Sequence, residues 1–288
     1  MSDLEKIFAR ARKRNAKVVF PELADPRVAE AADRLAADGL CQPIPLSDIS
    51  EFHVAVLTQA RGMKEAIARR LLSKPLYRAA AMVAAGEADA MVAGADSPTK
   101  RVIEAASIAI GLDETIKTPS SFFLMLFAQD RSLVFADCAV NVAPTQPELV
   151  DIARATAASA TGLLGSARLA MLSYSTVASG QGASVDLVAS ATAELQRVGV
   201  DCFGPIQADA ALNQTIGVKK GVTVGDFNVL VFPDLNAGNI GYKLCQELAG
   251  AQALGPFLQG FRKQVCDLSR GATVADIVAA TAVTVAIG

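Results

Sequence analysis

Residues 228–250 read NVLVFPDLNAGNIGYKLCQELAG and place an apolar strand directly before a helix. The apolar run ends in Pro233 and Asp234, and residues 237–250 then follow the period of an amphipathic helix. A near-continuous apolar run suits a strand that is covered on both faces, as in parallel sheets. The segment therefore predicts a βα unit whose polar residues follow the carboxyl end of its strand.

The same order of apolar run and helical segment recurs on both sides of this unit. Strands are expected at 17–20, 42–46, 89–95, 122–127, 132–137, 168–175, 201–207 and 228–234, with a last one at 255–261. Helices are expected at 26–39, 62–72, 75–86, 98–110, 144–160, 185–199, 208–220, 237–250 and 273–287. We therefore expect an α/β fold with mostly parallel sheets and helices on both faces.

Composition favours a large core of small aliphatic residues. Of the 288 residues 52% are hydrophobic and 19% charged, and Trp is absent, so Ala, Val, Ile and Leu must fill the core. The net charge is −2 without a basic block, which argues against nucleic acid or anionic lipid as a partner. The N-terminus lacks the apolar segment of a signal peptide, and no apolar run reaches the roughly 18 residues of a spanning helix. We expect a cytoplasmic protein.

Neither metal nor histidine chemistry is expected. Five cysteines are widely spaced without a CxxC pair, so no disulfide framework or zinc site is predicted and we interpret them as small core residues: Cys41, Cys138, Cys202, Cys245 and Cys266. The single histidine, His53, has no pattern of Ser, Asp or Cys around it, which argues against a catalytic triad. We interpret His53 as a surface or edge residue.

Candidate functional residues follow strands, because ligands of open α/β sheets bind beyond the carboxyl ends of the strands. One strand leads into Ser175, Thr176 and a Gly/Ser loop, whose hydroxyl and backbone N–H groups could hold a phosphate. An ordinary βα turn is the alternative. Asp234 is interpreted as a helix N-cap. Lys243, one turn into that helix, could bind an anion or be a solvated lysine.

Residues 266–278, CDLSRGATVADIV, combine an arginine and a carboxylate at the start of an apolar helix. Ser269 and Arg270 precede the helix, and an arginine beside a helix N-terminus favours a phosphate or an acyl oxygen. Asp276 lies three residues after Thr273. It could complete a capping box with that threonine, or it could act as a base next to the anion site.

Several sequence blocks resemble the phosphate acetyltransferase/phosphate butyryltransferase family. They are FADCAVN (135–141), MLSYST (171–176), IQADAAL (206–212), VFPDLNAGNIGYKL (231–244), GPFLQG (255–260) and DLSRGATVADIV (267–278). The N-terminal FPELADPRV and the GEADAMVAGAD stretch are similar too. The resemblance covers nearly the whole chain and is densest from Ser120 onward.

The resemblance implies a two-domain α/β/α sandwich, the architecture of isocitrate and isopropylmalate dehydrogenases. Residues 1–112 and 260–288 would form the first domain, and residues 113–259 would form a second domain inserted into it. The active site would lie in the cleft between the domains, and homodimers are common in the family. These boundaries are carried over from the matching blocks.

The resemblance also implies a reaction, acyl-CoA + phosphate ⇌ acyl phosphate + CoA, most simply with an acetyl group. Coenzyme A is a substrate here, and neither a metal nor a permanently bound cofactor takes part. The aspartate that matches Asp276 acts as the base on the CoA thiol, whose ordinary pKa is about 8.5. The serine and arginine that match Ser269 and Arg270 hold the phosphate and the developing oxyanion.

Six further residues match family positions that contact substrate. Four lie near the phosphate and the acyl group, namely Ser175, Thr176, Asn239 and Lys243. Two arginines contact mainly the phosphates of CoA, namely Arg27 and Arg101. Each arginine stands where a strand gives way to a helix, and by position alone it would pass as a surface residue.

The chain departs from the family pattern at three places. The region before TQARG (58–62) is shorter by roughly 30–40 residues, and Thr58 replaces a substrate-contacting arginine of the family, with Arg61 as a substitute. This leaves the affinity for CoA open. Gly204–Pro205 is closer to the butyryl branch, which leaves propionyl and butyryl groups as alternative substrates. Cys266 stands where Asn is usual.

Two other functions were weighed against the acyltransferase. A non-catalytic CoA-sensing or oligomerisation module, like related domains fused to malic enzymes, would suit the short N-terminal region, but Ser269, Arg270 and Asp276 are all present. A β-decarboxylating dehydrogenase shares the two-domain architecture but needs a cluster of metal-binding carboxylates, and the sequence shows no such set. The acyltransferase, with small-molecule substrates and a second copy of itself as partners, remains the leading prediction.

Overall fold

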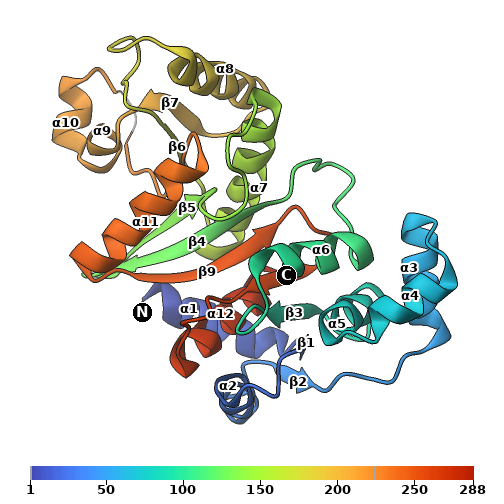
Figure 1. The fold of residues 1–288 in the computed structure, drawn as a ribbon. Coiled ribbons are helices and arrows are strands. Elements are labelled where there is room, and N and C mark those ends of the chain that lie inside the picture. Colours follow the sequence, from blue (N-terminus) through green and yellow to red (C-terminus); the bar gives the residue numbers. More distant parts are fainter. Residues whose placement is uncertain (1, 223–224) are drawn as a thin grey trace. The chain divides into compact units, whose positions relative to one another are not determined.

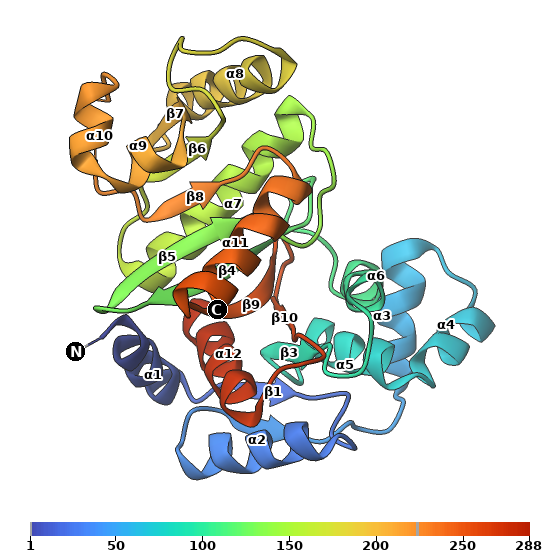
Figure 2. The same ribbon diagram turned by 60° about the vertical axis from the view of Figure 1, so that its left-hand side comes forward.

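The computed structural model describes residues 2–222 and 225–288, without the side chains of residues 60 and 61. The chain divides into two compact units. Residues Met1–Thr115 and Gly255–Gly288 form the first unit, and residues Ile116–Leu254 form the second. Each unit carries strands of a mostly parallel mixed sheet with helices on both faces (Figures 1 and 2), so the predicted α/β class is confirmed.

The sheet of the first unit has the strand order β2-β1-β3-β10-β9. Its strands are β1 (Lys17–Val19), β2 (Gln42–Ile44), β3 (Ala90–Ala93), β9 (Gln252–Gln259) and β10 (Gln264–Asp267). β1, β2, β3 and β10 run parallel to one another. β9, at the end of this order, runs antiparallel to β10. The carboxyl ends of β1, β3 and β10 therefore lie at one edge, where a ligand site is expected.

Helices cover both faces of this sheet. They are α1 (Asp3–Arg14), α2 (Pro26–Ala37), α3 (Glu51–Arg61), α4 (Glu65–Leu72), α5 (Pro75–Ala84), α6 (Thr99–Ala109) and α12 (Val274–Ile287). Figure 2 shows α12 between α1 and α2, and these helices pack on one face while α5 and α6 contact the strands from the other. α12 is apolar around most of its circumference, which is why it is the central, buried helix of its layer.

The second unit is built on strands in the order β4-β5-β8-β6-β7. Their bounds are β4 (Ser120–Phe127), β5 (Arg131–Ala136), β6 (Leu169–Leu172), β7 (Cys202–Ile206) and β8 (Val229–Val231). β4 and β5 form an antiparallel hairpin, and β5, β8, β6 and β7 pair in parallel. Because β5, β6, β7 and β8 are parallel, the polar residues that follow them share one edge.

The helices of the second unit are α7 (Gln146–Leu164), α8 (Ala183–Arg197), α9 (Ala208–Leu212), α10 (Gln214–Lys219) and α11 (Leu235–Ala249). α11 crosses one face of β4 and β5 (Figure 1), and its Tyr242 ring stacks on Phe123 with centroids 4.3 Å apart. α7 packs against β4, β5 and β8. Among the described helices none combines the length and hydropathy needed to cross a bilayer.

Most expected elements are present, and the exceptions have local causes. The expectation that residues 255–261 form the last strand is wrong, because the short β10 follows and pairs with β3. The helix expected at 208–220 divides at Asn213, whose extended backbone and side-chain bond to the Ile216 N–H start a new helix. α1 and α3 were not expected from the sequence. Each begins with a capping box, at Ser2 and at Ser50.

The interpretation of His53 as a surface residue is wrong. Its side chain is fully buried at the start of α3. Nδ1 accepts a hydrogen bond from the Ser50 N–H at 3.3 Å, and Nε2 lies 2.8 Å from Glu87 Oε1. The other carboxylate oxygen of Glu87 accepts a hydrogen bond from the Ser47 hydroxyl. A polar ring can be buried when both nitrogens have partners, and one of these two partners, Glu87, is 34 positions away in sequence.

Candidate active site

Five of the predicted site residues gather at the carboxyl edge of the first unit's sheet. The loops after β1, β3 and β10 lead there into α2, α6 and α12, so the helix N-termini point the same way. The residues placed by these loops and first turns are Arg27 on α2, Arg101 on α6, and Ser269, Arg270 and Asp276 at the start of α12. The structure thus groups residues that are up to about 250 positions apart in sequence.

The start of α12 is a tight turn closed by a capping box. The Ala272 N–H donates to the Ser269 carbonyl at 2.9 Å. Asp276 Oδ2 accepts from the backbone and the hydroxyl of Thr273 at 3.0 and 2.7 Å, and Thr273 Oγ1 accepts from the Asp276 N–H at 3.2 Å. The capping interpretation of Asp276 is therefore confirmed, and its action as a base stays a prediction. The side chains of Ser269 and Arg270 are exposed beside this turn.

Arg27 uses all five of its guanidinium N–H groups inside the first unit. Nε and Nη2 donate to the two oxygens of Asp25 at 3.1 and 2.7 Å. Nη1 donates to the carbonyls of Arg270 and Ala272 at 2.8 and 3.0 Å. Nη2 also donates to the Ala95 carbonyl at 3.1 Å. The guanidinium lowers the pKa of Asp25, and Asp25 raises the pKa of Arg27. The expected contact of Arg27 with CoA remains a prediction.

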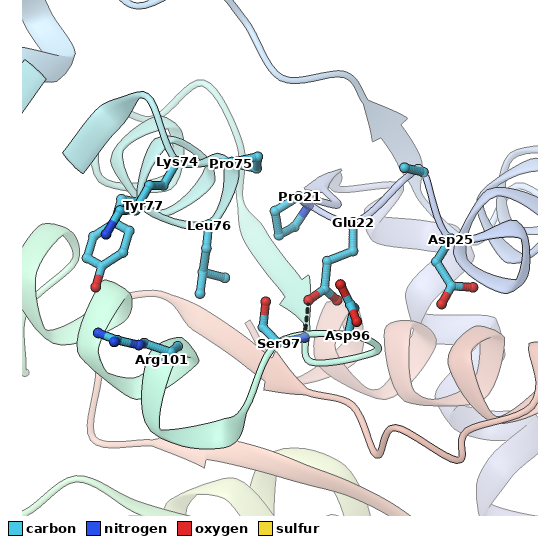
Figure 3. Close-up of a pocket in the computed structure, with 11 residues that line it drawn as sticks. Pro21, Glu22, Asp25, Lys74, Pro75, Leu76, Tyr77, Asp96, Ser97 and Arg101 are labelled. Carbon is cyan, nitrogen blue, oxygen red and sulfur yellow. Dashed lines mark hydrogen bonds between the residues drawn. The ribbon is translucent and has the colours of Figure 1, made fainter. Parts of the chain in front are cut away.

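A pocket of about 630 Å³ opens at the same edge of the first unit. Figure 3 shows its two unlike sides: Lys74, Tyr77 and Arg101 lie on one, and Glu22 and Asp96 lie on the other. The acidic side is partly neutralised by hydrogen bonds, since Glu22 accepts from the N–H groups of residues 95 and 97 at 2.8 and 2.7 Å. The basic side is the part of the pocket suited to an anion.

The basic side combines two cations with a helix N-terminus. Lys74 Nζ lies 5.6 Å from the centroid of the Tyr77 ring, and Arg101 Nη1 donates to Glu104 at 2.8 Å. α5 begins here with Lys74 at its N-cap position and Pro75 after it, and no side chain accepts from its first N–H groups. The Tyr77 hydroxyl is buried and makes no hydrogen bond to a described residue. Its pKa is raised by burial and by the nearby Glu104.

A buried carboxylate that the sequence interpretation missed lies behind this edge. Asp267 ends β10 and is 1% exposed, and neither of its oxygens has a hydrogen-bond partner among the described residues. Burial raises its pKa to about 7. Thr99 lowers this pKa, and the negative charge of Glu22 raises it further. Gly94 packs against it so closely that an added Cβ would lie 2.6 Å from the Leu268 nitrogen. A carboxylate at the end of an apolar strand was the available signal.

In the second unit, Ser175 and Thr176 are buried and hold a loop together. Ser175 Oγ accepts from the Gly180 N–H at 2.8 Å. Thr176 Oγ1 donates to Gln207 Oε1 and accepts from the Gln207 N–H, both at 3.1 Å. Lys220 Nζ donates to the same Gln207 oxygen at 2.9 Å. The hydroxyls thus serve the βα turn, and phosphate binding by them stays a prediction.

Asn239 and Lys243 lie on the second and third turns of α11. Asp234 accepts from the Ala237 N–H at 2.9 Å, so its predicted role as the N-cap is confirmed. Asn239 Nδ2 donates to the Cys138 carbonyl at 3.1 Å. Lys243 is exposed, with Nζ 4.9 Å from the centroid of the Tyr242 ring. Asn239 is therefore held by a backbone carbonyl, and the exposed ammonium of Lys243 is accessible to a ligand.

The buried turn that receives Asn239 is organised by Asp137. This carboxylate, at the end of β5, accepts from the N–H groups of residues 139, 140 and 141 at 2.9–3.2 Å. It also accepts from the Asn141 side chain at 2.6 Å and from the Ser121 hydroxyl. Asp137 belongs to the FADCAVN block, but the sequence interpretation assigned it no role. Its signal was again an acid at the end of an apolar strand.

Two of the residues at which the chain departs from the family pattern, Thr58 and Cys266, make ordinary contacts within their elements. Thr58 Oγ1 donates to the Ala55 carbonyl within α3 at 3.1 Å, and the side chain of Arg61 lies outside the described part of the chain. Cys266 is buried in β10, and burial raises its pKa far above the usual range for a thiol. The interpretation of this cysteine as packing is confirmed.

Comparison with known proteins gives a consistent relationship. A family model described as phosphate acetyl/butaryl transferase matches residues 2–57 and 51–285. The phosphate acetyltransferase of Paracoccus denitrificans is 37% identical, and the alignment covers 99% of this chain and 98% of that protein. The phosphate acetyltransferase of Nitratidesulfovibrio vulgaris is also 37% identical over 96% of this chain, which spans only 44% of that longer protein.

Solved structures agree. The phosphotransacetylase from Streptococcus pyogenes has a TM-score of 0.90 at 34% identity, with 98% of each chain covered. A Salmonella typhimurium protein described as a 4-hydroxythreonine-4-phosphate dehydrogenase has a TM-score of 0.58 at 11% identity, over 95% of this chain and 99% of that one. The second likeness concerns the fold alone and accords with the expected dehydrogenase-like architecture.

Proposed function

Because the chain belongs to the phosphate acetyl/butyryl transferase family, we propose that it catalyses the reversible reaction acetyl-CoA + phosphate ⇌ acetyl phosphate + CoA. One observation in the structure carries the chemistry. Ser269, Arg270 and Asp276 lie within about two turns of one another at the start of α12, at the carboxyl edge of a parallel sheet. This places a carboxylate, a hydroxyl and a guanidinium at a helix N-terminus, which favours anions.

In the direction of acetyl-CoA synthesis, the first requirement is a thiolate. At neutral pH a thiol with a pKa of about 8.5 is mostly protonated, so a base that takes its proton accelerates the reaction. Asp276 is that base. The sulfur then attacks the carbonyl carbon of acetyl phosphate, the C–S bond forms, and the C–O bond to phosphate breaks. Phosphate leaves with the bonding electrons, and the proton on Asp276 passes to it or to solvent.

Charge develops on the acyl oxygen and on the leaving phosphate during this step. Arg270 donates two hydrogen bonds to the phosphate through its guanidinium, and the Ser269 hydroxyl donates a hydrogen bond to the oxyanion. Both side chains are exposed on a turn whose backbone is fixed by hydrogen bonds. Fixed donors stabilise the transition state because they need no reorganisation during the reaction.

Arg101 and Lys74 hold phosphate groups of CoA in the pocket of the first unit. They supply two positive charges beside the uncapped N-terminus of α5. The role of Lys74 compensates for Thr58, which stands where the family pattern has an arginine. Arg101 is exposed enough to contact a bound CoA, since 59% of its side chain is accessible.

The second unit supplies contacts to the acyl group and its phosphate, through Ser175, Thr176, Asn239 and Lys243. Three of these side chains are held by hydrogen bonds, and Lys243 provides the positive charge. The division of the chain into two compact units supports the proposed pair of domains, with the second inserted into the first. Gly204–Pro205 in β7 resembles the butyryl branch of the family, so propionyl and butyryl groups stay alternative substrates.

We further propose a homodimer. Ile240, Leu244 and Leu248 are exposed at four-residue spacing and therefore share one face of α11. A row of large exposed apolar side chains is typical of a protein interface. The symmetric self-association of identical surfaces is the commonest assembly of soluble proteins.

The decisive test follows CoA-dependent thioester formation by ultraviolet absorbance, with acetyl, propionyl and butyryl phosphate in separate assays and EDTA throughout. We expect turnover with acetyl phosphate, unaffected by the chelator. A clear preference for propionyl or butyryl phosphate would instead assign the chain to a longer acyl group. Calorimetric binding of CoA without turnover of any of the three would show a non-catalytic CoA-binding protein.

A further inference from the structure

We propose that Arg27 is a positioning residue, which holds the turn of Ser269 and Arg270 in its catalytic conformation and does not itself bind CoA. The inference rests on the proposed function and changes the role that the family resemblance gives to Arg27. It concerns one side chain at the carboxyl edge of the first unit.

The hydrogen-bonding capacity of Arg27 is already used. A guanidinium has five N–H groups and no acceptor, and all five of Arg27 donate to protein oxygens at 2.7–3.1 Å. A phosphate could bind only by displacing Asp25 or a backbone carbonyl. Displacement would leave a charged carboxylate or a partly buried carbonyl without its partner, and such groups are costly.

The charges around Arg27 also disfavour a second anion. Asp25 forms a bidentate pair with it, and Glu22 and Asp96 are close enough to raise its pKa further. A CoA phosphate at this position would therefore meet three carboxylates and one guanidinium. The charge around Arg101 is more favourable to an anion. Glu104 is its ion-pair partner, and a second cation, Lys74, lines the same pocket. The pocket thus has a place for a phosphate, and that place is away from Arg27.

The bonds of Arg27 connect the ends of three strands. Asp25 follows β1 and caps α2, Ala95 follows β3, and the carbonyls of Arg270 and Ala272 follow β10. The carbonyl bonds bridge 243 and 245 positions of sequence. Within the turn itself, the described bonds are those from the Ala272 N–H to the Ser269 carbonyl and from the Gly271 N–H to the Ser269 hydroxyl.

A turn with few internal bonds needs an external partner to fix its orientation. Arg27 binds the carbonyl of Arg270 itself, so it determines how the peptide that carries the catalytic guanidinium is turned. Displacement of a reacting group by about 1 Å can cost roughly a hundredfold in rate. Lysine could not replace Arg27, because a single ammonium cannot reach the carboxylate and three carbonyls together.

The test compares Arg27→Lys and Arg27→Ala with Arg101→Ala, which removes a side chain proposed to bind the phosphates of CoA. Turnover number, KM for acetyl phosphate and calorimetric Kd for CoA are measured, and circular dichroism checks the fold. We expect Arg27→Lys and Arg27→Ala to lower kcat at least about tenfold with the Kd for CoA unchanged within about twofold. Arg101→Ala should raise that Kd. Arg27→Lys keeps the charge and serves if Arg27→Ala does not fold.

A second readout is hydrogen exchange of the backbone amides at residues 268–273. We expect faster exchange in both Arg27 variants and unchanged exchange in Arg101→Ala. A rise in the Kd for CoA as large as that of Arg101→Ala would overturn the proposal, whatever happens to kcat. Unchanged kcat together with unchanged exchange would overturn it too. If the parent protein binds CoA but shows no turnover, the proposed function fails, and the exchange and Kd measurements still decide the role of Arg27.

Discussion

Three carboxylates near the start of α12 have very different surroundings. Asp25 is paired with a guanidinium, which lowers its pKa. Asp267 is buried without a partner among the residues described, which raises its pKa to about 7. Asp276 accepts two hydrogen bonds from Thr273. One residue type therefore provides a fixed negative charge, a carboxyl that is largely protonated below neutral pH, and a proposed base.

Asp276→Asn separates the capping role of this residue from its catalytic role. The amide oxygen can still accept from Thr273, so the helix cap and the thermal stability should persist. The amide cannot take a proton from a thiol, so kcat should fall by roughly 10²–10⁴-fold. Steady-state kinetics and thermal melts measure the two effects. Asp276→Ala is the control and should lose turnover together with about 0.5–2 kcal/mol of stability. Full activity of Asp276→Asn would disprove the base assignment.

Asp267 should make stability depend on pH. Its folded pKa of about 7 lies above the ordinary aspartate value of 3.8, so the folded state binds the proton more tightly than the unfolded state. The stabilising contribution is fully present below about pH 4 and is lost as the pH rises through about 7. The total loss of stability is roughly 4 kcal/mol, at about 1.4 kcal/mol per pKa unit.

Asp267→Asn removes this titration, and urea unfolding between pH 4 and 8 measures it. The stability of the variant relative to the parent should therefore increase through that interval and level off above about pH 7. The comparison between the two proteins cancels the titration of the remaining carboxylates. Parallel stability curves for the two proteins would show that Asp267 ionises normally.

At the scale of elements, the N-termini of helices set where charge can gather. α12 has its capping box, and α2 is capped by Asp25. α5 and α6 have no side-chain cap and both begin at the pocket lined by Lys74 and Arg101. Uncapped N–H groups beside cations favour a ligand that supplies the missing oxygens.

Lys74→Ala should therefore raise the KM for CoA several-fold and leave kcat nearly unchanged, because the lost charge acts on binding. The effect should shrink at high ionic strength. Initial rates at varied CoA and salt concentrations provide the measurement. Lys64→Ala is the matched control, since Lys64 starts the uncapped α4 and does not line the pocket. Equal effects of the two substitutions would exclude a specific role for Lys74.

The start of α11 depends on a glycine that permits a close helix approach. An added Cβ at Gly238 would lie 3.0 Å from Cys138 Sγ and collide with the Asp137 carbonyl. Gly238→Ala should therefore destabilise the protein by about 1–3 kcal/mol and weaken the Asn239 contact. Gly162→Ala in α7 is the control, because its Cβ would meet nothing within 4 Å. It should be neutral or stabilising by about 0.5–1 kcal/mol. Denaturant melts distinguish the two.

At the scale of the whole molecule, the apolar face of α11 predicts how copies associate. Light scattering after size exclusion should show a dimer at micromolar concentration. Leu244→Glu should convert it to a monomer, because a charge buried at an interface without a partner is costly. The control is Val198→Glu, which changes an exposed apolar residue at the end of α8 and should leave the dimer intact. A monomeric parent protein would exclude this interface.

Local pattern was sufficient for much of this molecule. The apolar runs and helical periods of the βα units predicted the α/β class and most elements, because burial of a strand or helix face depends on nearby residues. The spacing of Thr273 and Asp276 predicted a capping box, and Asp234 was recognised as an N-cap, since both are interactions within one helical turn. The four-residue β10 was missed because so short a run carries little periodicity.

The sequence by itself thus determined most of the elements, the caps at Asp234 and Thr273 and, through its long matching blocks, the family. The tertiary structure alone decided which polar groups are satisfied and which are desolvated. Arg27 received two of its acceptors from residues more than 240 positions away, His53 was buried against Glu87, and Asp267 was removed from water without gaining a hydrogen bond from the described residues. The physical reason is that hydration and hydrogen bonding depend on atoms that only the folded chain brings together.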